Sequence, residues 1–149
     1  MEVNEFINQN LIKMNLKSTD KDSVIEEMID IMVENEVITD KDEVVKKAME
    51  REEKGTTGVG KGVAIPHVKS DAVKRPAVAF GRSDNGIDYG SMDEKPSYLF
   101  FLITVPEESH DEHLKLLAKL SRNLVHDDFR DSLLEAKNSE EVMSILENI

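Results

Sequence analysis

The longest apolar run of the chain, residues 97–105, is the feature that most constrains its fold. It reads SYLFFLITV, and Pro106 follows it. A strand that is apolar at successive positions is typical of a sheet covered on both faces, because successive side chains point to opposite sides. A membrane-spanning helix needs about 20 apolar residues, so this run is too short to cross a bilayer. We therefore expect a central core strand and no direct membrane insertion.

Short strand patterns alternate with amphipathic helix patterns along the rest of the chain. The expected strands are residues 12–16, 63–65, 77–81 and 97–105. The expected loops are residues 56–62, which are rich in glycine, and residues 83–96, which are rich in turn-forming residues.

The expected helices follow residues that can cap free amides. These residues are Thr19, Thr39 with Asp42, and the S-x-x-E pair Ser109 and Glu112. The second helix is expected to end at Gly55, in the position that favours a positive φ. Two further helices are expected near residues 129–136 and 139–147.

This alternation of strands and helices predicts an α/β fold. A length of 149 residues suits a single domain, residues 1–149. We expect a mixed, mainly parallel sheet flanked by helices on both faces. In such sheets, functional sites gather at strand ends and in the loops that follow them.

Charge and composition exclude several classes of function. The formal net charge of −12, with lysines interspersed among carboxylates, argues against nucleic acid as a partner. The chain contains no cysteine, so it has no disulfide or thiolate chemistry. The first residues are acidic where a signal peptide would be positive, so we expect a cytoplasmic protein. Its partners are expected to offer basic or apolar surfaces.

His67 is the strongest candidate for a chemical role. It follows the strand pattern 63–65 and Pro66, which lacks an amide donor and is expected to stop the strand. A histidine held there has an unperturbed pKa of about 6.5, so its ring is largely neutral and can act as a nucleophile. If a backbone carbonyl holds one ring nitrogen, the other can accept a phosphoryl group. This chemistry needs neither a nucleotide nor a metal, so no cofactor is expected.

Two further residues are candidates for stabilising the phosphoryl oxygens. Arg51 is expected in the last turn of the helix that ends at Gly55, and a guanidinium group offers a fork of donors to phosphate. His113 is expected in the first turn of the helix that begins near Ser109, together with His110. For His110, a solvent-facing position is the simpler interpretation, and for His126 a structural one.

Two other kinds of site are weighed against this hypothesis. Residues 55–61 match the G-x-x-x-x-G-K spacing of a nucleotide-binding loop, but Gly62 replaces the required hydroxyl residue, and the loop follows a helix instead of a strand. The loop is either a flexible connection or a segment whose amides shape the rim of the His67 site. His110 and His113 share a helix face but would need a third ligand to bind a metal, so no metal site is expected.

The stretch GKGVAIPH, residues 60–67, with Glu52 upstream, resembles the signature of the enzyme IIA components of the bacterial phosphoenolpyruvate-dependent sugar phosphotransferase system. The similarity is to the fructose–mannitol type, which includes nitrogen-related regulatory versions, and it covers nearly the whole chain. Residues 111–121 also match, and residues 86–93 lean toward the fructose subgroup. One departure is Val68, where the family usually has a smaller residue, which could alter the rim of the pocket.

The resemblance implies a fold and a set of roles. The fold is a five-stranded mixed sheet flanked by helices, in one enzyme IIA type 2 domain. His67 matches the phosphorylated histidine, His113 the second histidine that faces it, and Arg51 an arginine of the same site. The donor would be the histidine-containing phosphocarrier protein and the acceptor a IIB component, with the membrane IIC transporter involved indirectly. The sugar is expected to be fructose-like.

A regulatory module is the alternative function. In this hypothesis, phosphorylation of His67 controls which protein the domain docks on, with no onward transfer to sugar. Residues 83–95 would then be part of the docking surface.

Overall fold

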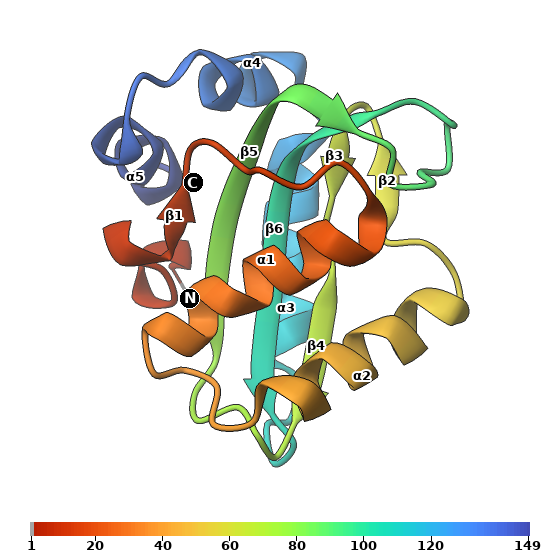
Figure 1. Ribbon diagram of the computed structural model, residues 1–149. Helices are drawn as coiled ribbons and strands as arrows, with labels where there is room; N and C mark the ends of the chain where they lie inside the picture. Colours follow the sequence, from red (N-terminus) through yellow and green to blue (C-terminus); the bar gives the residue numbers. More distant parts are fainter. Residues whose placement is uncertain (1) are drawn as a thin grey trace.

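The computed structural model describes residues 2–149 as one mixed β-sheet with helices on both faces (Figure 1). The strands are β1 (Ile12–Lys13), β2 (Gly58–Gly60), β3 (Val63–Ala64), β4 (His67–Ser70), β5 (Ala77–Ile87) and β6 (Ser97–Pro106). The helices are α1 (Lys21–Glu34), α2 (Lys41–Glu53), α3 (Glu112–Leu124), α4 (Asp127–Glu135) and α5 (Ser139–Glu147). Two short 3₁₀ helices, η1 (Val3–Glu5) and η2 (Gln9–Leu11), come before β1.

The predicted α/β class and mixed sheet are confirmed. The strand order is β1-β5-β6-β3-β2, and β4 also pairs with β6. Three ladders are parallel, β1 with β5, β3 with β6 and β4 with β6, whereas β5 with β6 and β2 with β3 are antiparallel. Helices α1 and α2 lie on one face of the sheet and α3 lies on the other (Figure 1).

Strand β6 is the centre of this arrangement, as its apolar sequence predicted. Nearly all its side chains are buried, and it pairs with β3, β4 and β5. Pro106 is its last residue. The Phe101 ring meets that of Phe80 on β5 edge to face, with centroids 5.1 Å apart. The core is therefore built outward from the longest apolar run of the chain.

β3 ends before Pro66, as predicted, but the pairing with β6 resumes directly after the proline as β4. β3 and β4 lie in one register against β6, with Val63 opposite Leu99 and His67 opposite Ile103. The Ile103 amide donates to the Pro66 carbonyl at 3.0 Å, so the proline removes a donor without displacing the chain. His67 is thus the first residue of β4. If β3 and β4 are counted as one interrupted strand, the sheet has the five strands that the resemblance implied.

The helices form near their predicted positions, but other residues cap them. Asp20 accepts a hydrogen bond from the Ser23 amide at the start of α1, and Asp40 accepts one from the Glu43 amide at the start of α2. Thr39 instead donates its hydroxyl to the Ala72 carbonyl. The two aspartates directly follow the predicted threonines, so the patterns located these helix starts to within one residue.

The predicted capping box at the start of α3 was also wrong. Ser109 lies outside the helix, whose N-cap is Asp111 without a side-chain cap. His110 consequently lies before the first turn of α3 and is exposed, while His113 lies within that turn. At the end of α2, Gly55 follows the C-cap Lys54 with a φ of 150°, a positive value as expected there.

Both predicted loops contain strand residues. Residues 58–60 form β2, which pairs antiparallel with β3, so the glycine-rich segment is a hairpin and not an open loop. β5 extends to Ile87, through the first part of the predicted loop 83–96. No helix within residues 2–149 has the length and apolar character needed to span a membrane.

We predict that Phe101→Ala lowers the free energy of unfolding by about 3–5 kcal/mol, because it leaves a cavity at the centre of the sheet. Urea denaturation followed by circular dichroism measures this change. Met92→Ala is the control: this side chain is 71% exposed, so the change should stay within about 0.5 kcal/mol. Equal effects of the two substitutions would contradict the central role of β6.

Candidate functional site

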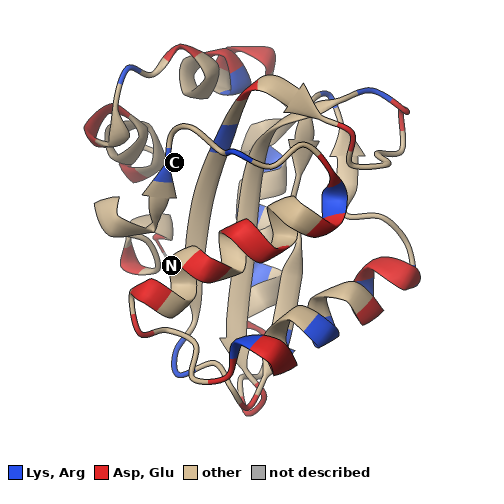
Figure 2. Cartoon of the chain, in the orientation of Figure 1, with Lys and Arg blue, Asp and Glu red and all other residues tan. Residues whose placement is uncertain are grey.

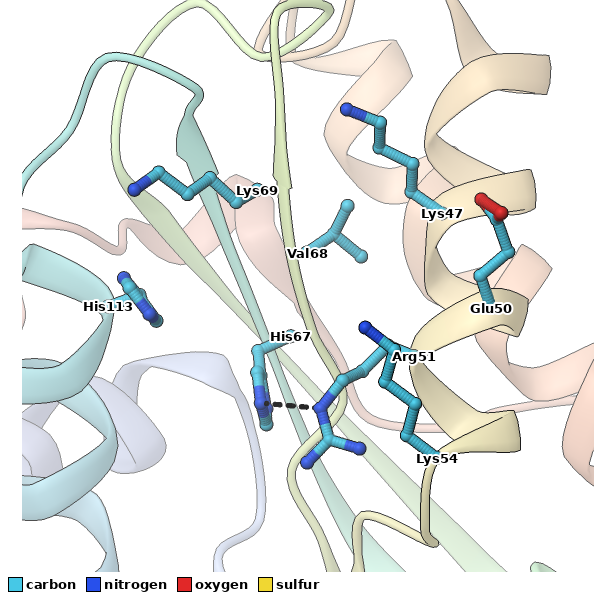
Figure 3. A pocket seen from close by; sticks show the side chains of 8 residues that line it. All are labelled: Lys47, Glu50, Arg51, Lys54, His67, Val68, Lys69 and His113. Atoms are coloured by element: carbon cyan, nitrogen blue, oxygen red, sulfur yellow. Dashed lines mark hydrogen bonds between the residues drawn. The ribbon is translucent and has the colours of Figure 1, made fainter.

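A cavity of about 450 Å³ opens where β4 borders α2 and α3. The three sequence-predicted residues, Arg51, His67 and His113, all line it. Figure 3 shows His67 between Arg51, which comes from α2, and His113, which comes from α3. Residues far apart in the sequence therefore meet here, because β4, the end of α2 and the start of α3 lie around one cavity.

The position of β4 at the side of the sheet makes this cavity accessible. Within residues 2–149, β6 is the one strand that pairs with β4, so the other edge of β4 faces away from the sheet. His67 and Lys69 alternate with the buried Val68 and Ser70 along this strand. Alternation thus turns His67 and Lys69 to one side of the strand while Val68 packs on the side of α2. Val68, the residue that departs from the family pattern, also lines the cavity.

Both nitrogens of the His67 ring have defined partners. Nδ1 lies 2.9 Å from the Ile65 carbonyl oxygen, which can only accept, so Nδ1 carries the proton. Nε2 therefore holds the lone pair, and it accepts a hydrogen bond of 3.2 Å from Nε of Arg51 (Figure 3). The arrangement presents a neutral imidazole with its nucleophilic nitrogen pointing to the guanidinium group.

The surroundings of His67 favour the neutral ring. Burial lowers the pKa of His67 below its ordinary value, and the neighbouring Arg51 and His113 act in the same direction. The Ile65 carbonyl and the Glu52 charge oppose this shift without cancelling it. The ring is consequently unprotonated at neutral pH, which is the form that can act as a nucleophile.

His113 reaches the cavity from the first turn of α3. Its Nδ1 is buried and has no hydrogen-bond partner among residues 2–149. An unsatisfied buried polar atom costs about 1–3 kcal/mol, so a ligand that bonded to it would recover that free energy. His113 therefore has an unused hydrogen-bonding group beside the cavity.

The cavity is cationic although the chain carries a net charge of −12. Acidic residues are spread over the helices and loops (Figure 2), whereas four cationic side chains and one acidic side chain, Glu50, line the cavity. The cationic residues are Lys47, Arg51, Lys54 and Lys69. Lys47 also pairs with Glu107 at 3.1 Å. The cavity is thus suited to an anionic group.

The three lysines were missed in the sequence analysis, although the sequence carries a signal for them. Lys47, Arg51 and Lys54 lie four and three residues apart, which places them on one face of a helix. Lys69 lies two residues after His67, which places it on the same side of a strand. These spacings become informative only once Arg51 and His67 are assigned to one site.

Other candidates lie outside the cavity. His110 and His126 do not line it, and neither do residues 56–62, so their amides do not form its wall. Just before this segment, the Gly55 carbonyl accepts a hydrogen bond of 3.0 Å from Nη1 of Arg51. In residues 2–149, no three His, Cys, Asp or Glu side chains gather in a geometry that could hold a metal ion.

Comparison with known proteins identifies the family. Residues 5–149 match the family model described as "Phosphoenolpyruvate-dependent sugar phosphotransferase system, EIIA 2". The chain belongs to this family, as its resemblance to the enzyme IIA components indicated.

One relative and two solved structures illustrate the range of the family. The fructose-specific EIIA component of Haloferax volcanii is 42% identical over 93% of this chain and 90% of its own length. The crystal structure of the nitrogen regulatory protein IIA-Ntr from Neisseria meningitidis is 33% identical, with a TM-score of 0.88 over 95% of this chain and 97% of that one. Enzyme IIAMTL from Escherichia coli, solved in complex with phosphorylated enzyme IIBMTL, is 20% identical, with a TM-score of 0.82 over 96% and 98% of the two chains.

We predict that Arg51→Met raises the pKa of His67, because it removes a positive charge that disfavours the protonated ring. A ¹H–¹⁵N NMR titration of the His67 ring measures the pKa directly. Lys54→Met is the matched control, since it removes a positive charge from the same cavity without a contact to His67. A lowered or unchanged pKa in Arg51→Met would contradict the contact between Nε of Arg51 and Nε2 of His67.

Proposed function

We propose that this domain is a phosphocarrier that accepts a phosphoryl group on Nε2 of His67 from the histidine-containing phosphocarrier protein. It then passes the group to a IIB component, in the uptake of a fructose-like sugar through a membrane IIC transporter. The observation that carries the proposal is the His67 ring itself, held at Nδ1 by the Ile65 carbonyl, with its nucleophilic nitrogen at a cationic cavity. We place the reaction in the cytoplasm as part of the same proposal.

The reacting groups in this transfer are the donor's phosphohistidine and the His67 ring, and no cofactor takes part. The lone pair of Nε2 attacks phosphorus on the donor's phosphohistidine, and a new P–N bond forms as the donor's P–N bond breaks. The electron pair of the broken bond returns to the donor's ring nitrogen. Positive charge develops on the His67 ring during the attack, and the Ile65 carbonyl, which accepts the hydrogen bond from Nδ1–H, stabilises it.

Arg51 has two successive roles in this proposal. Before transfer, its Nε donates to Nε2 of His67 and so occupies the lone pair that must attack. An incoming phosphoryl group offers anionic oxygens, which are better acceptors for a guanidinium than a neutral imidazole. The guanidinium then turns to those oxygens and frees the lone pair, while the Gly55 carbonyl keeps Nη1 in place. His113 contacts the same oxygens from the other side of the cavity.

A regulatory function is the second candidate. It is favoured by the similarity to the nitrogen regulatory protein of N. meningitidis, which covers 95% of this chain at 33% identity. In this role the phosphorylation state of His67 would control docking on a target protein, and no IIB component would receive the group. Incubating the phosphorylated domain with a fructose-type IIB domain and following the label separates the functions: transfer supports the carrier role, and retention supports the regulatory one.

We predict that His67→Ala abolishes labelling by phosphoenolpyruvate, the phosphocarrier protein and its kinase, because no other ring replaces the acceptor. Mapping an acid-labile, base-stable phosphate on the wild-type chain identifies the site. His126→Ala, which removes an exposed imidazole distant from the cavity, should be labelled as well as the wild type. Labelling that survived in His67→Ala would refute the assignment.

We also predict that His113→Ala folds normally but accepts the phosphoryl group about a hundredfold more slowly, since it loses a group that stabilises charge in the transition state. Rapid-quench measurement of the transfer rate tests this. His110→Ala removes an exposed imidazole only three residues away and should leave the rate unchanged. If the two variants behaved alike, His113 would have no part in the transfer.

A further inference from the structure

We propose that Glu52, Thr57 and Tyr89 form a positioning network that holds the His67 ring and Arg51 in the geometry for phosphoryl transfer. This inference rests on the proposed function and names residues that do not touch the phosphoryl group. We call these three residues, together with Lys21, the Glu52 network. None of its four residues lines the cavity.

The Glu52 carboxylate is the centre of the network. Its side chain is only 6% exposed, and Oε1 lies 2.8 Å from Nζ of Lys21, the first residue of α1. The Thr57 backbone amide donates to Oε1 at 3.0 Å, and the Thr57 hydroxyl donates to Oε2 at 2.5 Å. Every one of these partners is a donor, so both oxygens of the buried carboxylate act as acceptors.

Tyr89 completes the network from the segment after β5. Its hydroxyl lies 2.8 Å from the Thr57 hydroxyl oxygen, in a fully buried position. Because the Thr57 proton is directed at Glu52, Tyr89 must be the donor in this pair. Burial and the nearby Glu52 charge raise the pKa of Tyr89, so its hydroxyl keeps the proton that it donates. Lys21 lies over the Tyr89 ring, 4.9 Å from its centroid.

Thr57 connects the network to the His67 ring. Its backbone carbonyl accepts a hydrogen bond of 2.9 Å from the Ile65 amide. The Ile65 carbonyl in turn accepts a hydrogen bond from Nδ1–H of His67, also at 2.9 Å. Glu52 therefore fixes Thr57, Thr57 fixes Ile65, and Ile65 sets the tautomer and orientation of the nucleophilic ring.

Glu52 also connects the network to Arg51, its neighbour in the sequence. The Glu52 backbone carbonyl accepts a hydrogen bond of 3.1 Å from the Gly55 amide, and the Gly55 carbonyl accepts one of 3.0 Å from Nη1 of Arg51. The bond from the Thr57 amide to the Glu52 side chain closes the turn that contains Gly55. The Glu52 residue thus holds in place the backbone carbonyls that support both Arg51 and His67.

Stability alone is a poor explanation for such a group. Removing a carboxylate from water is costly, and apolar residues of similar volume often serve a core as well or better. One chain of contacts from the network ends on the His67 ring, and the other ends on the Arg51 guanidinium group. Catalytic groups need support that holds them in position to a fraction of an ångström. The contacts therefore point to a role in positioning.

The test uses Thr57→Val, which removes the hydroxyl and keeps the shape of the side chain. We expect the rate of phosphoryl transfer from the phosphorylated carrier to fall about tenfold to a hundredfold, as small displacements of reacting groups do. We also expect ¹⁵N NMR of the unphosphorylated chain to show a mixture of His67 tautomers in place of the Nδ1–H form alone. Thr57→Ser restores the hydroxyl and should recover both the rate and the single tautomer.

Thr104→Val is the matched control. Thr104 is equally buried, and its hydroxyl makes only a long contact of 3.8 Å to Sδ of Met32, so the same chemical change is made without touching the Glu52 network. Its rate and tautomer should match the wild type. If Thr57→Val does not fold, Glu52→Gln replaces it as the test variant. Glutamine keeps the shape of the side chain but removes the negative charge that the three donors contact.

Two outcomes would overturn the proposal. One is a folded Thr57→Val with the wild-type rate and tautomer. The other is a slower Thr57→Val whose tautomer is unchanged and which Thr57→Ser does not rescue, as expected of general destabilisation. The tautomer measurement needs no phosphoryl donor, so it tests the Glu52 network even if the carrier fails to label the wild-type chain, a result that would count against the proposed function alone.

Discussion

The pairing of β3 and β4 with β6 is the constraint on which the rest of the structure depends. β6 is buried along nearly its whole length, so its position is fixed by the core, and the strands that pair with it inherit that position. His67 lies opposite Ile103 in this ladder and belongs to a strand whose backbone is hydrogen-bonded to the buried core strand of the sheet. The side chain still reaches the cavity, because β4 lies at the edge of the sheet. A rigid backbone and an accessible ring are thereby combined in one residue.

Local and overall electrostatics differ in sign in this protein. The net charge of −12 keeps general anions away, yet the cavity walls carry four cationic side chains. Helix α2 contributes Lys47 and Arg51, its C-cap is Lys54, and β4 contributes Lys69. The electrostatic field inside the cavity is therefore set by the secondary structure, which brings together cationic residues that are scattered in the sequence. The composition alone does not reveal this local field.

Sequence patterns predicted the elements better than their ends. Apolar periodicity placed β6 and α5 almost to the residue, since burial dominates both. The helix caps were predicted less exactly, because Thr19 and Asp20 are both good N-cap residues and the structure uses Asp20. Pro66 correctly marked the end of β3, because its missing donor is a local property, but the pairing with β6 that resumes in β4 depends on tertiary structure. His67 was found because the short signature of residues 60–67 carries it, and Arg51 and His113 because phosphate chemistry and the family resemblance pointed to them. The signature also includes Glu52, but no local pattern reveals that Glu52 and Thr57 lie beside Lys21 and Tyr89.

The exposed border of β4 has a consequence for self-association. An edge strand leaves backbone donors and acceptors unmatched, and another chain can add to it as a further strand. β4 is four residues long, begins after a proline and carries Lys69 on its accessible side, all of which make it a poor template for such growth. Lys69, two residues from the proposed acceptor His67, thus has a second consequence: the same charge that suits the cavity to an anion disfavours strand addition at the border of β4 that faces away from the sheet.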